Sequence, residues 1–325
     1  MKKVMKIILI IFAVIILLIV GGIAILFKLA GEKTKNYYKY TETAGELEAK
    51  YTAMGNLSVS SYEHDTGDDV MKKIVIYYPK ELKEKCPVVI WANGTGSKSN
   101  TYTSFFKHLA SWGFIVVGND DENTRTGESL NKCIDYLIQE NGNADSIFYN
   151  KIDLDDIGIG GHSQGGPAVF NMATNQSHAD MVKTVYAVSA TSSYHTKTFK
   201  DGWEYDVSKI NVPVFLTAGT GTFDAGTALS ADTESDEKAG IMQGICPLWS
   251  LEENFNLLPD NIDKVYVRKT GVDHGDSYLQ FDAYMTAWFR YYLMGDEEAG
   301  KAFYGDDPEI SSNPKYQDVN IHKAE

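Results

Sequence analysis

The chain has 325 residues, 43% of them hydrophobic and 23% charged, which is typical of a globular protein with a substantial core. Its formal net charge of −14 argues against a nucleic acid partner, because phosphate backbones bind basic surfaces. The three cysteines, Cys86, Cys133 and Cys246, are too few for a disulfide framework and lack metal-site spacing, although a Cys86–Cys133 bridge stays open. We therefore expect neither a metal nor a cofactor.

The first predicted element is a membrane-spanning helix. Residues 7–27 carry no charge, and as a helix they extend about 31 Å, close to the thickness of a bilayer core. A cleavable signal has an apolar core of about 7 to 15 residues, so we favour a single-pass signal anchor over a secreted chain that has lost its signal. Lysines flank both ends of the span. We expect the N-terminus inside the cell and the following domain outside, because a short basic segment before an apolar run is typical of export signals.

The remainder is predicted to form a polar stalk (31–54), one folded domain (55–305) and a polar tail (306–325). In the domain, apolar runs typical of strands alternate with stretches of helical spacing. The expected strands are 73–78, 87–91, 114–117, 157–159, 184–188, 212–216 and, last, 265–267. The expected helices are 102–112, 130–138, 167–173 and 278–293. This alternation predicts an α/β fold with a mainly parallel sheet and helices on both faces.

Two segments of the domain interrupt or join these elements. Residues 225–262 lack clear periodicity and form an acidic insertion, which is either a cap over the functional site or a surface excursion. The segment Gly161-His-Ser163-Gln-Gly165 joins the strand 157–159 to the helix 167–173. A Gly-x-Ser-x-Gly turn in that position is typical of a nucleophile elbow, whose tight turn strains the serine and leaves no room for neighbouring side chains. A purely structural glycine turn is the alternative, and the strand–turn–helix setting favours Ser163 as a nucleophile.

A serine nucleophile needs a base, and the base needs an acid. In sheets of this kind the chain order is serine, acid, histidine. Of the seven histidines, His274 is the one that follows the last expected strand and precedes the last helix, so we predict it as the base. Asp224 is the first carboxylate after the strand 212–216 and is the predicted acid. The alternatives are the other nearby carboxylates, Asp232, Glu234, Asp236, Asp273 and Asp276.

The oxyanion of a tetrahedral intermediate requires two backbone N–H donors. Gln164 follows the serine and begins a helix, whose N-terminal dipole favours negative charge. Thr95 lies in the glycine-rich loop after the strand 87–91 and is the second predicted donor. A glycine turn without a catalytic role is the alternative for that loop.

Four segments together resemble the polyesterase–lipase–cutinase branch of the α/β-hydrolases, which is related to the dienelactone hydrolases. They are 89–98, 109–120, 148–166 and 287–296. The resemblance covers roughly residues 55–305 and implies the α/β-hydrolase fold, with Ser163 as nucleophile and His274 as base. It also implies an oxyanion hole at Thr95 and Gln164. It places an aromatic wall of the substrate cleft near Tyr194.

Together these residues predict a membrane-anchored, extracytoplasmic serine ester hydrolase acting on a small-molecule or lipid-like ester. Two alternatives remain. An acyltransferase or peptidase acting on envelope material would share the acyl-enzyme chemistry. A catalytically silent binding module on the cell surface is the alternative from another class.

Overall fold

A computed structural model describes residues 31–199, 202–236 and 238–325. The chain divides into two units, residues 1–41 and 42–325. In the first unit the described residues include the single 3-10 turn η1 (Tyr37–Lys39). The predicted membrane span, residues 7–27, lies outside the described residues, and no helix within the described ranges has the length and apolar character needed to cross a bilayer.

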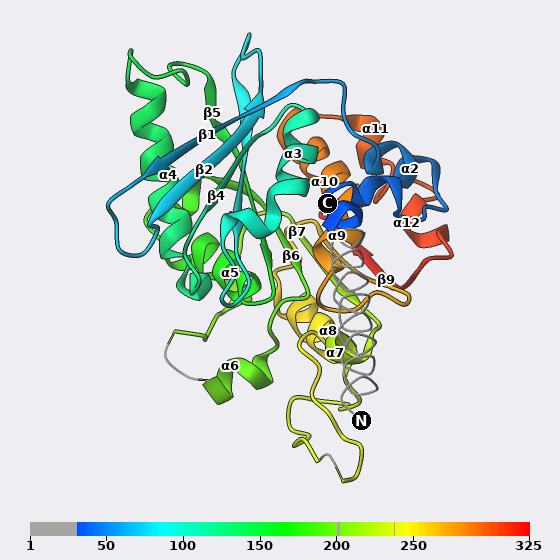
Figure 1. Ribbon diagram of the computed structural model, residues 1–325. Coiled ribbons are helices and arrows are strands. Elements are labelled where there is room, and N and C mark those ends of the chain that lie inside the picture. The colour runs from blue at the N-terminus through cyan, green and yellow to red at the C-terminus, as the bar shows by residue number, and fades with distance from the viewer. Residues whose placement is uncertain (1–30, 200–201, 237) are drawn as a thin grey trace, which may run out of the picture. The chain divides into compact units, whose positions relative to one another are not determined.

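The second unit, in its described residues, is built on one nine-stranded sheet with the order β1-β2-β4-β3-β5-β6-β7-β8-β9 (Figure 1). The strands are β1 (Val59–Asp65), β2 (Lys73–Pro79), β3 (Cys86–Ala92), β4 (Ile115–Asn119), β5 (Ile152–His162), β6 (Val182–Val188), β7 (Val214–Gly219), β8 (Lys264–Lys269) and β9 (Tyr316–His322). All pairings from β4 to β8 are parallel. The β1–β2, β2–β4 and β8–β9 pairings at the two edges are antiparallel.

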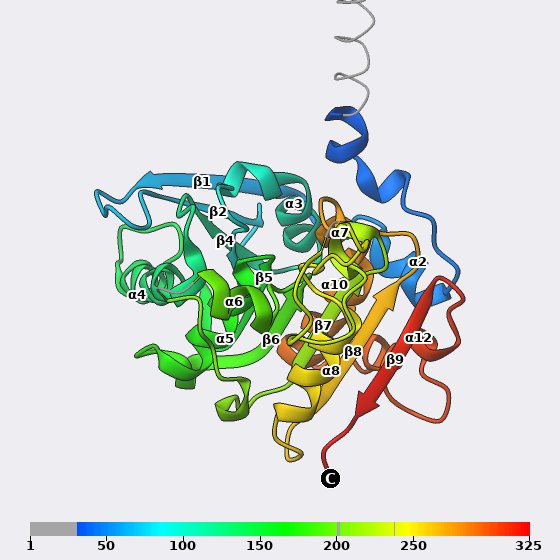
Figure 2. The same ribbon diagram turned by 90° about the horizontal axis from the view of Figure 1, so that it is seen from below.

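Helices cover both faces of this sheet (Figure 2). One face carries α3 (Thr103–Ser111) and α10 (Asp282–Met294), and the other carries α4 (Glu128–Gly142), α5 (Gly165–Asn175) and α8 (Leu248–Leu257). The short helices are α2 (Glu46–Thr52), α6 (Ser193–Phe199), α7 (Thr222–Ala225), α9 (Ser277–Gln280), α11 (Glu297–Gly300) and α12 (Glu309–Ser312). Side chains alternate along each strand, so Val88 and Ile90 of β3 lie in the core with α4 and α5, while Trp91 packs edge-on against Phe105 of α3.

The predicted α/β class with a mainly parallel sheet is confirmed, but two predictions near the C-terminus were wrong. The strand at 265–267 is not the last, because β9, within the expected polar tail, pairs with β8. The second half of the expected insertion is not a loop, because residues 248–257 form α8 and place Leu251 and Phe255 in the core. Residues 226–236 and 238–247 form the described part of the remaining excursion, with isolated bridges from Gly226 to Gln243 and from Asp236 to Ile241.

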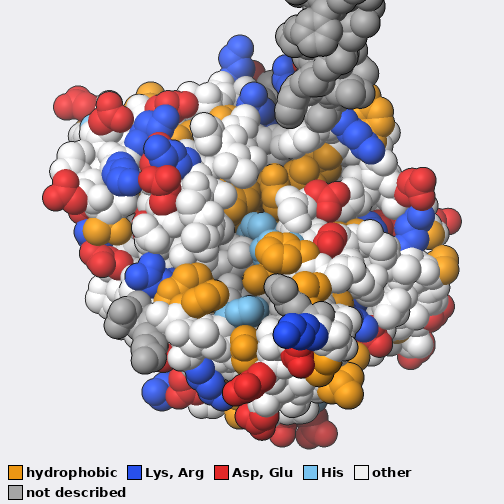
Figure 3. Space-filling view, turned by 60° about the horizontal axis from the view of Figure 1, so that its bottom comes forward, with side chains coloured by type: hydrophobic (Ala, Val, Ile, Leu, Met, Phe, Trp, Pro, Cys, Tyr) orange, Lys and Arg blue, Asp and Glu red, His pale blue; other side chains and the backbone are white. Residues whose placement is uncertain are grey.

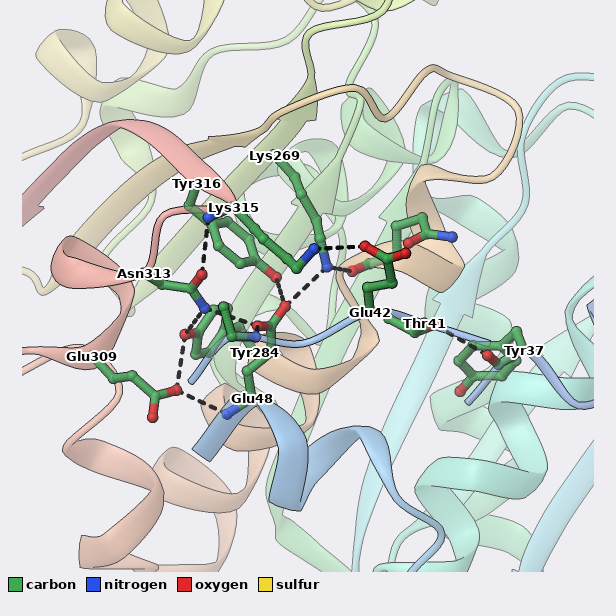
Figure 4. Close-up of polar contacts among 12 residues, drawn as sticks. Tyr37, Thr41, Glu42, Glu48, Lys269, Tyr284, Glu309, Asn313, Lys315 and Tyr316 are labelled. Carbon is green, nitrogen blue, oxygen red and sulfur yellow. Dashed lines mark hydrogen bonds and ion pairs between the residues drawn. The ribbon is translucent and has the colours of Figure 1, made fainter. Parts of the chain in front are cut away.

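Helix α2 lies in the stretch that was expected to form a stalk, yet it packs against α10. Its Glu48 is fully buried and paired with the buried Lys269 of β8, whose Nζ lies 2.9 Å from Glu48 Oε1 (Figure 4). Asn313 Nδ2 and Tyr316 Oη also donate to this carboxylate, at 2.8 and 2.9 Å. The buried negative charge is therefore both paired and hydrogen-bonded, as burial of an ion requires.

Glu309 supplies a second link between α2 and the C-terminal residues. Its carboxylate accepts hydrogen bonds from the backbone N–H groups of Leu47 and Glu48, at 2.7 and 2.8 Å. These N–H groups belong to the first turn of α2, where no intrahelical acceptor exists and where negative charge is favourable. The start of α2 is thus capped by a side chain that lies more than 260 residues later in the chain.

Candidate active site

The turn after β5 places Ser163 at the carboxyl edge of the sheet, between the end of that strand and the start of α5. Ser163 has a φ of +60°, a left-handed conformation that a residue with a side chain rarely adopts. The two flanking glycines are needed for close backbone approach. A Cβ on Gly161 would lie 2.1 Å from the carbonyl oxygen of Gly165, and one on Gly165 would lie 2.3 Å from that of Ala92. The geometry is that of a strained strand–turn–helix elbow.

The loop between β8 and α9 brings His274 to this serine. His274 Nε2 lies 3.0 Å from Ser163 Oγ, and His274 Nδ1 lies 3.0 Å from Asp224 Oδ1. The residue His274 is only 8% exposed, and Asp224 is fully buried. The structure thus joins the three predicted residues in one chain of hydrogen bonds, in which His274 can accept the serine proton while Asp224 holds its other nitrogen.

Asp224 is held rigidly at the start of α7, directly after β7. Its Oδ2 accepts hydrogen bonds from the backbone N–H of Gly219 at 2.6 Å and from Ser189 Oγ at 2.7 Å. Among the described residues, no other carboxylate hydrogen-bonds to the His274 imidazole. The alternative acids in the excursion lie elsewhere. Asp236, for example, accepts hydrogen bonds from the backbone of its own turn.

The two predicted oxyanion donors lie side by side. Gln164 Nε2 donates to Thr95 Oγ1 at 3.3 Å, and a Cβ on Gly94 would lie 3.4 Å from Ser163 Cβ, so the loop after β3 lies against Ser163. Within the described ranges, the backbone N–H groups of Thr95 and Gln164 donate to no other protein group. Both donors are therefore available to an oxyanion formed at Ser163.

His162 connects the loop that carries His274 to the loop after β3. Its Nε2 donates to the carbonyl oxygen of His274 at 3.0 Å, and Tyr102 Oη lies 3.5 Å from its Nδ1. Tyr102 Oη in turn accepts the backbone N–H of Gly94 at 2.8 Å. Burial, and to a lesser degree the electrostatic interaction with the His274 imidazole, lowers the pKa of His162 to about 3. His162 is therefore neutral in the folded protein, and its contacts join His274 to the loop after β3.

This neutral histidine predicts a pH dependence of stability. A histidine in the unfolded chain titrates near 6.5, so between pH 6.5 and about 3 the unfolded state binds a proton that folded His162 does not. The unfolding free energy should therefore fall as the pH falls through this window, by up to about 1.4 kcal/mol per pH unit. In His162→Gln the slope of unfolding free energy against pH should be shallower by the contribution of about one proton. Denaturant unfolding between pH 7 and 4 measures this slope. Equal slopes in the variant and the wild type would contradict this account.

The aromatic residues Tyr194 and Phe223 have different surroundings. Tyr194 is half-buried on α6, where its ring contacts that of His195, and among the described residues it makes no hydrogen bond or ring contact with Ser163 or His274. Phe223 stands edge-on to the His274 imidazole, with 5.3 Å between ring centroids, and is 57% exposed. Figure 3, which turns the α6 and α7 end of the molecule forward, shows hydrophobic side chains gathered beside histidines on this face.

The sequence did not predict the residues that hydrogen-bond to the predicted site residues and fix their positions. Ser189, in the loop after β6, has a φ of +49° and donates to Asp224, and its Oγ lies 2.8 Å from Ser277 Oγ. The strand order β5-β6-β7 places that loop between the serine and the acid, so the expected strand at 184–188 was a usable signal. No cluster of histidine, cysteine or acidic side chains suited to a metal ion occurs in the part of the chain that the structure describes.

Known proteins are similar to this chain over most of its length. A family model described as PETase, PET hydrolase-like, matches residues 71–318, a range that contains Ser163, Asp224 and His274. Cutinase est1 of Thermobifida alba is 24% identical over 230 residues, which cover 68% of this chain and 65% of that protein. Cutinase est2 of the same organism is 23% identical over 229 residues, covering 68% and 64%. Cutinase 2 of Thermobifida cellulosilytica is 24% identical over 229 residues, covering 68% and 73%. The chain thus spans just under two thirds of the length of the first two relatives.

Proposed function

Because the chain belongs to the PET hydrolase-like family of α/β-hydrolases, we propose that it is a serine carboxylic ester hydrolase that works through Ser163, His274 and Asp224. The observation that carries the proposal is the hydrogen-bonded chain from Asp224 through His274 to a serine held at a φ of +60°. A structural turn gives no reason for a strained serine to meet a histidine whose other nitrogen is bound by a buried carboxylate.

The reaction follows from these contacts. His274 Nε2 takes the proton of Ser163 Oγ as that oxygen bonds to the ester carbonyl carbon, and Asp224 stabilises the imidazolium that forms. The carbonyl oxygen becomes an oxyanion, which the backbone N–H groups of Thr95 and Gln164 bind. His274 then protonates the alcohol oxygen as the C–O bond breaks, leaving an acyl-enzyme. His274 then takes a proton from a water molecule as the water oxygen bonds to the acyl carbon. His274 returns this proton to Ser163 Oγ as the bond between Ser163 Oγ and the acyl carbon breaks, which releases the acid and free Ser163.

The proposed substrate is a small-molecule or lipid-like carboxylic ester. The relatives named above are cutinases, and esters are therefore the substrate class that this chain is proposed to share with them. The exposed ring of Phe223 beside the base provides an apolar contact, and the Thr95 hydroxyl provides a polar one on the oxyanion side. Neither the membrane anchor nor the excursion at 226–247 is part of the proposed chemistry.

We further propose that residues 7–27 anchor the enzyme in the cell membrane, with the catalytic unit outside the cell. The uncharged span is long enough to cross a bilayer, and a short basic segment precedes it. An extracytoplasmic enzyme anchored in this way would meet esters at the cell surface.

A fluorophosphonate probe tests both proposals, because it phosphonylates only an activated serine. With the purified full chain we expect one equivalent of label, located by mass spectrometry on the peptide that contains Ser163, together with turnover of p-nitrophenyl butyrate. Absence of label and turnover in the folded wild type would refute the hydrolase proposal. A membrane-impermeant probe should label the chain on intact cells, and labelling only after lysis would refute the orientation.

A further inference from the structure

The loops that carry the acid and the base are joined to each other along their lengths. We call residues 219–224 the acid loop and residues 270–276 the base loop. The backbone N–H of Gly221 donates to the carbonyl oxygen of Val272 at 2.7 Å, and that of Gly271 donates to Thr220 Oγ1 at 2.9 Å. The relative position of the acid and base loops is therefore set by direct contacts, in addition to the pairing of β7 with β8.

Asp273 is the centre of this junction. Its Oδ1 accepts the backbone N–H groups of both Asp224 and His274, each at 2.8 Å. Its Oδ2 accepts the backbone N–H of Phe223 at 3.2 Å. The backbone N–H groups of Asp224 and His274 thus share one acceptor, Asp273 Oδ1.

The sequence leaves room for this carboxylate and the carboxylate remains charged. A Cβ on Gly221 would lie 2.3 Å from Asp273 Cγ, so any side chain at 221 would displace the carboxylate. Partial burial acts to raise the pKa of Asp273, but the N–H donors of His274, Asp224 and Phe223 together bring that pKa below its ordinary value. Asp273 is therefore an anion at neutral pH, and hydrogen bonds to an anion are stronger than neutral ones.

We propose that Asp273 is a positioning residue for the reaction: by holding the backbones of Asp224 and His274 on one oxygen, it sets the 3.0 Å contact between their side chains. The inference rests on the proposed function and adds to it a residue that touches no reacting atom. A displacement of about 1 Å in such a contact lowers the rate by about 100-fold. Asp273 was considered from the sequence as the acid itself, whereas its carboxylate makes no hydrogen bond to the His274 imidazole.

The test compares four variants of the full chain with the wild type. Asp273→Ala removes the acceptor, Asp273→Asn keeps an uncharged acceptor, and Gly221→Ala displaces the carboxylate without removing it. Asp276→Asn is the matched control, because Asp276 is an exposed acid in the same base loop whose side chain caps no helix N–H. The measurements are kcat and KM for p-nitrophenyl butyrate, the thermal unfolding midpoint, and the low-field signal of His274 Nδ1–H in the proton NMR spectrum.

We expect Asp273→Ala and Gly221→Ala to lower kcat by about 30- to 100-fold with KM changed less than about twofold, and to lose the low-field signal while still folded. Asp273→Asn should retain part of the activity, and Asp276→Asn should retain all of it. The inference is overturned if Asp273→Ala keeps kcat within about twofold of the wild-type value. It is also overturned if Asp276→Asn lowers kcat as much as Asp273→Ala does, because loss of any negative charge in the base loop would then explain the effect. Should Asp273→Ala not fold, Gly221→Ala and Asp273→Asn decide the matter.

The low-field signal separates this inference from the proposed function. If the wild type were to turn over no ester and take no label, the hydrolase proposal would fail. The signal reports the contact between His274 and Asp224 without any substrate, so its persistence in both Asp273→Ala and Gly221→Ala would still overturn the positioning role.

Discussion

Replacement of Ser163 by alanine is expected to lower kcat for p-nitrophenyl butyrate by about 10⁶-fold. The variant loses the oxygen that bonds to the acyl carbon, and His274 Nε2 loses the partner that lies 3.0 Å away. The oxyanion donors at Thr95 and Gln164 remain, so a residual rate about 10³-fold above that in water is expected. Fluorophosphonate labelling should disappear completely.

The fold should be unaffected by this change. Ser163 Oγ has His274 as its hydrogen-bond partner among the described residues, and the backbone bonds of Ser163 to Val188 and Gly166 do not involve the side chain. The unfolding free energy should therefore stay within about 0.5 kcal/mol of the wild type. Ser177→Ala, at an exposed serine beyond the other end of α5, is the control and should keep full activity. Wild-type turnover by a rigorously purified Ser163→Ala would exclude Ser163 as the nucleophile.

Asp224→Asn is expected to lower kcat by about 10⁴-fold with little change in KM. The reason lies in the partners of the two carboxylate oxygens. Oδ2 accepts two hydrogen bonds, from Gly219 N–H and Ser189 Oγ, at 2.6 and 2.7 Å, and Oδ1 faces His274 Nδ1. The amide oxygen of asparagine must take the Oδ2 place, because an NH₂ group there would meet the Gly219 donor.

The asparagine NH₂ group then faces His274 Nδ1 and donates to it. That bond fixes the imidazole in the tautomer whose proton is on Nε2, the nitrogen that should accept the proton of Ser163. The measurement is kcat at neutral pH alongside Asp232→Asn, a control in the excursion that should stay within about twofold of wild type. A kcat for Asp224→Asn within about tenfold of wild type would show that another group orients the base.

The sequence allowed the centre of the fold to be predicted because its signals are local there. The central strand β3 is buried from Val88 to Ala92 and appears in the sequence as a continuous apolar run. Ser163 and His274 followed from chain order and from their places after strands. The edge strands β1 and β9 are largely polar, and their pairing depends on partners elsewhere in the chain, so they gave no comparable signal.

Other features depended on side-chain direction or on distant partners. Six carboxylates were candidates for contact with His274, and only the turn at 219–224 determines that Asp224 points inward while Asp273 binds backbone. Phe223, which precedes Asp224, lies edge-on to the His274 imidazole, a contact that depends on the direction of its side chain. Helix α2 is short and acidic in its first turn, and it is ordered by residues that follow it by more than 200 positions.

The contacts of α2 make the two ends of the second unit depend on each other. A chain shortened to begin at residue 55, the boundary expected from sequence, would lack Glu48, the counter-charge of Lys269, and the packing of α2 against α10. A chain that ended at residue 305 would remove Glu309, Asn313 and Tyr316, and with them the cap and two of the partners of Glu48. Proteolytic removal of either end would thus remove contacts that hold the other end in place. We therefore expect the smallest stable form of the second unit to include the buried carboxylate of Glu48.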